Sequence, residues 1–208
     1  MSQINVNKVI SPTQAASNGP SIEVASNGNM SMDTDTVFVD STNDRVGIGT
    51  SSPARTLDIQ HIGGIAFNAG LIFENCSLTG SGLSGTSHHS VEDENAKYWN
   101  GAASGNWTYN IRWNSGTTLD SKMSNGETIN ISYVTAVGGS SYYQSGFTID
   151  GSSKTVQWVD QLPPVQGGGR ESGDDAATSG FDVYSFAINK YSTNNYYILG
   201  SHTHFGAF

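Results

Sequence analysis

Residues 106–113 alternate between apolar and polar side chains, and this alternation constrains the fold more than any other feature. Successive side chains of a β-strand point to opposite faces of its sheet, so a period of two predicts a half-buried strand. The polar side chains would then face solvent and the apolar ones a core. The apolar side chains, which share one face, are Trp107, Tyr109, Ile111 and Trp113.

The same reasoning extends β-structure over most of the chain. Gly, Ser, Asn and Thr are abundant, and these residues favour turns and short strands over helix interiors. The only candidate helix is 90–99, with Ser90 as its N-cap and acidic residues in its first turn. We therefore predict an all-β protein in which residues 62–208 form an antiparallel, jelly-roll-like β-sandwich head. Further strands of this head are expected at residues 128–137, 146–151, 155–159, 181–189 and 196–201.

Residues 36–61 contain three very short apolar segments separated by turn-forming runs. Strands this short do not form a stable sheet alone, whereas the same segment from three chains could be buried around one axis. We expect a short, intertwined trimeric β neck in which Gly47 and Gly49 permit close backbone approach. The neck side chains expected to be buried together are Val37, Val39, Val46, Ile48, Leu57 and Ile59.

Residues 1–35 repeat the sequence Ala-Ser-Asn-Gly at positions 16–19 and 25–28. Asn-Gly pairs favour tight turns, so this region is interpreted as short extended pieces separated by turns. Its few apolar residues are too sparse to form a core alone. A free tail and an arm ordered against a partner both fit this pattern. We favour an extended N-terminal arm that binds a partner protein.

Two parts of the chain resemble one protein family. The segment VDSTNDRVGIGT at 39–50, followed by Ser-Pro at 52–53 and Leu-Asp-Ile at 57–59, resembles a motif of bacteriophage tail-fibre and virion structural proteins, especially from phages of marine cyanobacteria. The C-terminal third resembles a terminal β-domain of similar proteins. Residues 160–180 depart from the family, whose usual connection is shorter. The C-terminal resemblance is carried by residues 147–151, 156–158, 163–164, 181–186 and 198–201.

The resemblance implies a virion structural protein that is assembled in the cytoplasm of the host bacterium. In that family the neck segment occurs in trimeric fibres, so we expect a short homotrimeric tail or head fibre whose arm binds other virion proteins. A receptor-facing fibre would bind host surface glycans or proteins. A capsid decoration (cement) or tail-machine subunit would contact virion proteins only, and the absence of a long shaft favours this alternative. A monomeric glycan-binding module is the remaining alternative.

Charge and motif content argue against several other classes. The net charge is −9 and the basic residues are scattered, whereas nucleic-acid binding needs clustered Lys and Arg. No apolar run approaches the ~18–20 residues that a membrane span requires. The acidic cluster 92–94 is attributed to the candidate helix start, and no nucleophile, phosphate-loop or dinucleotide motif occurs in its required context. We predict a protein with no enzymatic activity, no nucleic-acid partner and no membrane insertion.

The pair His202 and His204 is the one candidate metal site. Residues two apart on a strand share a face, so three chains meeting there could surround a transition metal with imidazoles. We favour the simpler interpretation of two polar side chains on an exposed edge strand, and no other cofactor is expected. His88 and His89 are adjacent and would point to opposite faces of a strand.

A candidate receptor or partner surface is predicted around the long segment 161–180. Loops of this length without a periodic pattern are usually functional or disordered. The adjacent tyrosines at 142 and 143 are bracketed by Ser and Gly, which favours their exposure. The residues assigned to this surface are Tyr142, Tyr143, Pro164, Arg170, Asp174 and Asp175.

Overall fold

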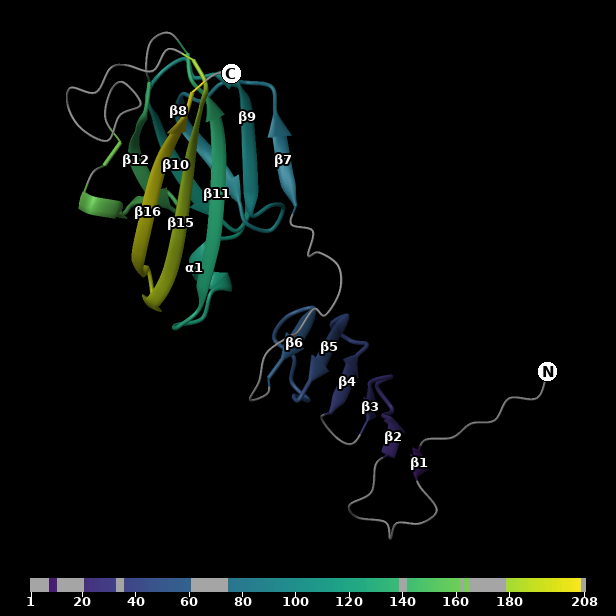
Figure 1. Ribbon diagram of the computed structural model, residues 1–208. Coiled ribbons are helices and arrows are strands. Elements are labelled where there is room, and N and C mark those ends of the chain that lie inside the picture. The colour runs from purple at the N-terminus through teal and green to yellow at the C-terminus, as the bar shows by residue number, and fades with distance from the viewer. Residues whose placement is uncertain are drawn as a thin grey trace. The chain divides into compact units, whose positions relative to one another are not determined.

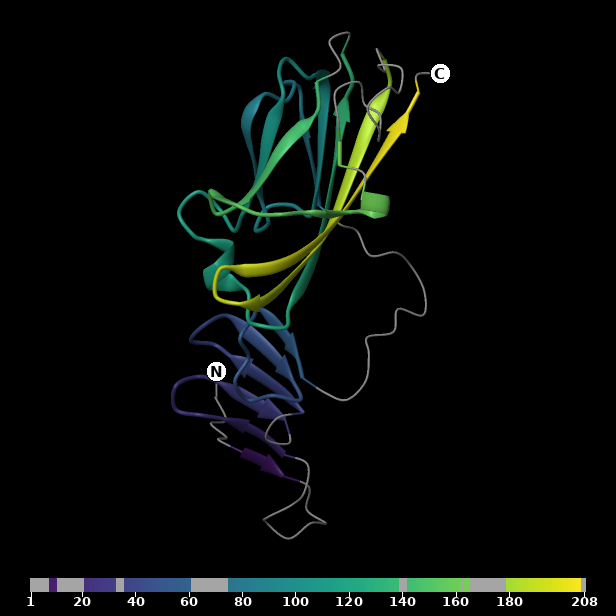
Figure 2. The same ribbon diagram turned by 90° about the vertical axis from the view of Figure 1, so that its left-hand side faces the viewer.

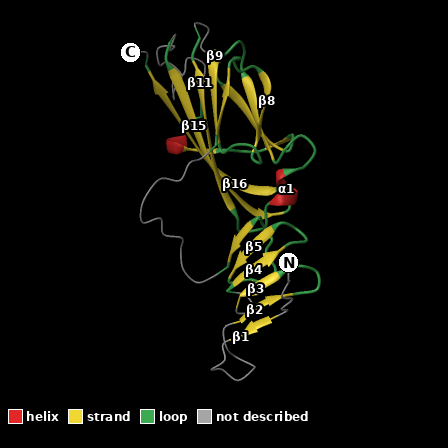
Figure 3. Ribbon diagram, turned by 90° about the vertical axis from the view of Figure 1, so that its right-hand side faces the viewer, coloured by secondary structure: helices red, strands yellow, loops and turns green. Residues whose placement is uncertain are grey.

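A computed structural model describes residues 8–10, 21–32, 36–60, 75–138, 142–161, 163–164 and 179–206. The chain is nearly all β, as predicted, and divides into two units, Met1–Leu71 and Ile72–Phe208 (Figure 1). The described helical segments are α1 (Leu119–Lys122) and a 3₁₀ turn (Val159–Gln161), coloured red in Figure 3. Among the described residues, no helix is long and apolar enough to cross a membrane.

The N-terminal unit is one six-stranded sheet in the order β1-β2-β3-β4-β5-β6 (Figure 1). Neighbouring strands are antiparallel except β5 and β6, which are parallel. The three strands predicted for the neck are confirmed as β4, β5 and β6. The strands are β1 (Lys8–Ile10), β2 (Ser21–Val24), β3 (Met30–Met32), β4 (Val37–Asp40), β5 (Arg45–Ile48) and β6 (Leu57–Ile59).

The predicted boundary between arm and neck at residue 35/36 is wrong. Strand β3 of the expected arm pairs with β4 of the expected neck, so both belong to one sheet. The Asn-Gly turn that joins β2 to β3 is closed by a hydrogen bond from Ala25 N to Asn29 O, and Gly28 has φ +86°. The boundary between the two units falls at 71/72 instead of the predicted 61/62.

The C-terminal unit is a sandwich of two sheets, which Figure 2 shows as two layers. The larger has the order β14-β16-β15-β11-β9-β7 and the smaller has the order β13-β12-β10-β8. The first six strands are β7 (Cys76–Thr79), β8 (Gly85–Ser90), β9 (Ala96–Ala102), β10 (Trp107–Arg112), β11 (Thr128–Ala136) and β12 (Gln144–Ile149). The last four are β13 (Ser152–Ser153), β14 (Gln157–Trp158), β15 (Phe181–Ser192) and β16 (Asn195–Phe205).

The prediction of an antiparallel, jelly-roll-like sandwich is wrong in its strand directions. From β7 to β12 the chain alternates between the two sheets, so that β7, β9 and β11 are parallel to one another, as are β8, β10 and β12. This part of the chain is therefore a flattened coil with two strands per turn. The long β15–β16 hairpin then continues the larger sheet in antiparallel fashion beside β11. Residue alternation reports the face of a side chain and carries no information on pairing direction.

The helix predicted at 90–99 is also wrong. Ser90 ends β8, residues 91–93 form a turn, and β9 begins at Ala96. Glu94 is buried beside Lys97, with 2.8 Å between the carboxylate and ammonium groups, so it does not lie on a solvated helix start. The acidic run matched a helix N-terminus locally, but pairing of β9 with β7 and β11 decided its structure.

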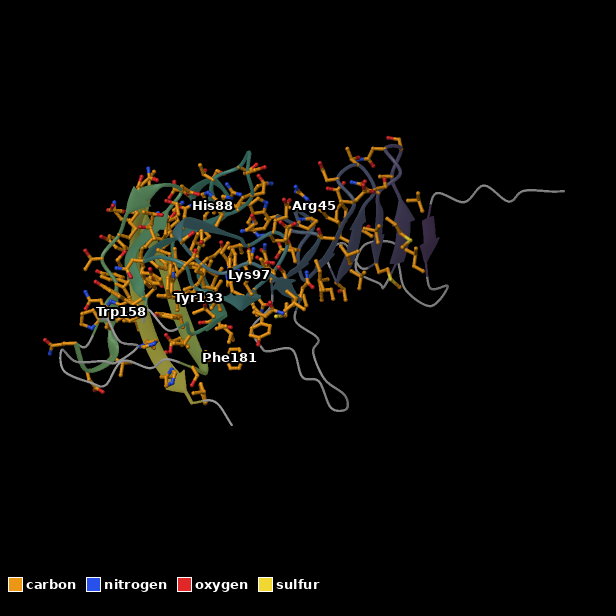
Figure 4. All side chains as sticks on the ribbon, turned by 90° about the horizontal axis from the view of Figure 1, so that it is seen from above. Arg45, His88, Lys97, Tyr133, Trp158 and Phe181 are labelled. Carbon is orange, nitrogen blue, oxygen red and sulfur yellow. The ribbon has the colours of Figure 1, made fainter. Side chains whose placement is uncertain are left out.

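The core of the C-terminal unit lies between its two sheets. The inward side chains of β10 meet those of β11 and β15, which confirms the predicted core position of the β10 aromatics. Tyr133, labelled in Figure 4, is fully buried and stacks between Tyr109 and Tyr184, at ring-centroid distances of 3.9 and 4.7 Å. Its hydroxyl accepts a hydrogen bond from Trp107 Nε1 and donates one to Gln144 Oε1.

Candidate functional site

The N-terminal sheet has one apolar face, built from two rungs of side chains. A rung here means residues that are paired in register across neighbouring strands. Val37 and Ile48 lie two positions from Val39 and Val46, which places the two rungs on one face. The first rung is Val24, Met30, Val39, Val46 and Leu57. The second contains the paired residues Ile22, Met32 and Val37, and the pair Ile48 and Ile59.

No described residue of its own unit covers this face. Leu57 is 57% exposed and Ile48 is 37% exposed, and the four valine and methionine side chains in the middle of the sheet are half-buried. The described residues of the unit form a single layer, so no second sheet covers the face. All six aliphatic residues predicted for the neck lie on it. The remaining exposed members of the face are Ile22, Val24, Met32 and Ile59.

Gly47 and Gly49 are not positioned as predicted. Gly47 is paired with Phe38 and Asp58 on the opposite face, so it cannot open the apolar face to a neighbouring chain. A Cβ at Gly47 would lie 2.3 Å from the backbone oxygen of Thr50, and Gly49 has φ +72°. Both glycines are therefore required by the turn that follows β5 in their own chain.

His202 and His204 share a face of β16, as predicted, but both are engaged within the chain. The Asp182 carboxylate contacts His204 Nδ1 at 2.8 Å and His202 Nε2 at 3.5 Å. His202 is buried and stacks on Tyr184 with 4.5 Å between ring centroids. No group of three or more potential metal ligands is arranged to hold an ion among the described residues. A metal shared by three chains stays a prediction, and it would require His202 to leave this core position.

His88 and His89 point to opposite faces of β8, as predicted: His88 is exposed and His89 is buried. The Nδ1 atom of His89 lies 2.9 Å from the Tyr109 hydroxyl, and its Nε2 atom lies 2.9 Å from the Glu94 backbone oxygen. Because a carbonyl can only accept, Nε2 carries the proton. Burial lowers the pKa of His89, which favours this neutral form. This cluster is satisfied internally and holds the turn after β8.

The predicted receptor surface is only partly described. Tyr142 and Tyr143 are half-buried, and Tyr142 packs against the hydrophobic core. Tyr143 lines a hollow of about 240 Å³ together with Pro164, which is buried and so adds nothing to an exposed surface of this chain. Arg170, Asp174 and Asp175 lie outside the described residues, as does nearly all of the segment 161–180.

No known protein family, no curated protein and no solved structure matches this chain. The exposed apolar face of the N-terminal sheet is the feature of the described residues that most requires a partner. The two faces of this sheet differ sharply, because its opposite face carries Ser31, Phe38, Gly47 and Asp58 at the corresponding positions.

Proposed function

We propose that the protein is a non-enzymatic structural subunit of a bacteriophage particle, a short homotrimeric fibre attached through its N-terminal unit. The observation that carries this proposal is the uncovered face of ten aliphatic side chains on a single-layer sheet. A sheet of three- and four-residue strands with one bare apolar face requires a partner to be stable in water.

The energetics of this face favour an obligate assembly. Fully burying one large aliphatic side chain contributes about 1.5–3 kcal/mol. The six exposed residues are already roughly half-buried, so covering them contributes about 4–8 kcal/mol, which is comparable with the stability of a single domain. A second copy of the same face supplies a matching apolar surface. The trimeric state itself is supported by the resemblance of residues 39–59 to the necks of trimeric phage fibres.

The same resemblance supports two alternative roles for the fibre within the particle. A tail or head fibre would hold other virion proteins through its N-terminal strands and present the C-terminal sandwich outward for adsorption to the host. A decoration or tail-machine subunit would use the same assembly but contact virion proteins only. Only residues 61–74 separate the last strand of the apolar sheet from the sandwich in the sequence. So short a segment cannot form a long shaft, which favours the latter role.

Solution mass tests the assembly. Light scattering of the full-length protein should give three times the chain mass of 22.0 kDa. A mass of one chain at all accessible concentrations would refute the proposal. Immunogold labelling of particles of a phage whose genome encodes this chain would then distinguish a head location from a tail location. Unlabelled particles would refute the virion role.

A further inference from the structure

The exposed large hydrophobic side chains gather on two faces only. Of the thirteen in the described residues, six belong to the apolar face of the N-terminal sheet. The other seven lie on the outer face and rim of the larger sheet of the C-terminal unit. Leu78 is 67% exposed, Tyr197 61% and Leu199 59%. The remaining four are Val159, Phe181, Tyr191 and Phe205.

The outer face of this larger sheet carries no charged side chain at its described outward positions on β7, β9, β11, β15 and β16. These outward positions alternate with the buried ones, such as Ile131 and Tyr133 on β11. The chain as a whole has 18 acidic and 9 basic residues. One rung is Leu78, Tyr98, Val134, Val183 and Thr203, and the next is Cys76, Ala96, Ser132, Ser185 and Ser201.

The centre of the face is hollowed into an open groove of about 730 Å³. The hollow forms because the second rung consists of small side chains, which leave space above the backbone. The outward side chains that line it come from β11, β15 and β16 and include Ser132, Ser185 and Leu199. The sheet thus presents an uncharged groove with small polar side chains on its floor and Leu199 and Val159 exposed beside it.

We propose that this face is a second self-association surface, on which another copy of the same chain packs within the trimer. The proposal rests on the proposed function, because assembly through the N-terminal sheet tethers the C-terminal units at high effective concentration. Charge supports a second copy as the occupant. Copies with a net charge of −9 repel one another, and an uncharged face lets them meet with the least repulsion. Depletion of charge and enrichment of aromatic residues mark the cores of protein interfaces.

Thiol reactivity tests the proposal at the centre of the face. The reporter is Ser185→Cys in a Cys76→Ser background, which removes the only native cysteine. The matched control is Thr86→Cys in the same background, because Thr86 is exposed on β8 of the smaller sheet. Each cysteine variant is reacted with a disulfide reagent in two forms. One is the assembled trimer, and the other also carries Val39→Asp, which dissociates the assembly. Near-ultraviolet circular dichroism verifies that the C-terminal core stays folded in every variant.

The thiol at position 185 should react roughly tenfold faster after dissociation, the factor given by about 1.4 kcal/mol of protection. The thiol at position 86 should react equally in both forms. Equal rates at position 185 in a protein that light scattering shows to be trimeric would overturn this inference and leave the proposed function standing. Slowing of that thiol by added oligosaccharides in the trimer would also overturn it, and would assign the groove to sugars. A monomeric parent protein would overturn both proposals.

Discussion

The N-terminal sheet carries ten aliphatic side chains on a face that no described residue of its own unit covers, whereas the C-terminal strands turn theirs toward a second sheet. Leu57 in the first unit is more than half exposed, while Ile111 in the second is fully buried. Both side chains occupy the same kind of position, the apolar face of a strand with period two. They differ because a second sheet of the same chain covers Ile111, whereas no described second layer covers Leu57.

Alternation therefore specifies which face of a strand is apolar and leaves open what covers that face. In the C-terminal unit the chain crosses between two sheets at each successive strand from β7 to β12, so each turn of the coil covers itself. In the N-terminal unit consecutive strands are neighbours in one sheet, and the described strands build no second layer. Stability of the first unit should therefore depend on protein concentration, and stability of the C-terminal core should not.

The largest effect is expected from a charge on the uncovered face. Val39→Asp would place three carboxylates in the interface, at a desolvation cost of several kcal/mol per chain. The mass by light scattering should fall from three chains to one. The matched control is Ser31→Asp, on the opposite face of the adjacent strand, which should remain trimeric. Dissociation by the control as well would mean that both faces of the sheet are covered in the assembly.

A cavity in the C-terminal core should lower the stability of that unit and leave the trimer intact. Ile111→Ala should destabilise this unit by about 2–5 kcal/mol, because it removes a fully buried side chain. Chemical denaturation monitored by tryptophan fluorescence should show a midpoint independent of protein concentration, and the trimer should persist below it. Thr108→Ala, on the other face of the same strand, should change stability by less than about 0.5 kcal/mol. A concentration-dependent midpoint for Ile111→Ala would show that the two units are not energetically separate.

Removal of one buried hydroxyl should have a smaller effect. Tyr133→Phe leaves Trp107 Nε1 and Gln144 Oε1 without their shared partner, which should cost about 1–3 kcal/mol in the free energy of unfolding. Adding Gln144→Met should recover part of this loss, because the orphaned acceptor is removed. Failure of the double variant to recover any stability would indicate that Gln144 contributes through packing alone.

The smallest effect is expected from pH. Burial lowers the pKa of His89 below its ordinary value of 6.5, so the unfolded chain binds the proton more readily than the folded one. Stability of the C-terminal unit is then complete above pH 6.5 and declines as pH falls toward the folded pKa, by at most about 1.4 kcal/mol per pH unit for one proton. His89→Gln should flatten this slope in urea denaturation. Partial burial also lowers the pKa of His88, but its side chain stays exposed to solvent, so His88→Gln is the control and should flatten the slope less. An unchanged slope in His89→Gln would contradict the assignment.

Sequence reasoning found the elements with strong side-chain alternation and missed those without it. The alternating segments at 106–113 and 128–137 became β10 and β11, and the six aliphatic neck residues share one face. Strands β7, β8 and β9 were not predicted, because polar and small residues such as those at 85–90 dominate them. The uncharged outer face of the larger sheet was equally hidden, since its rungs join residues more than a hundred positions apart.

The all-β class, the apolar side of the well-patterned strands and the shortage of core in the first sixty residues can be read from the amino-acid sequence alone. These properties follow from side-chain chemistry at a spacing of two residues, which is local. The parallel coil of β7 to β12, the single sheet formed by arm and neck, and the contacts of Asp182 with His202 and His204 emerge only from the folded chain. Pairing uses backbone hydrogen bonds that nearly every residue can make, so direction and partner depend on which strands the fold brings together.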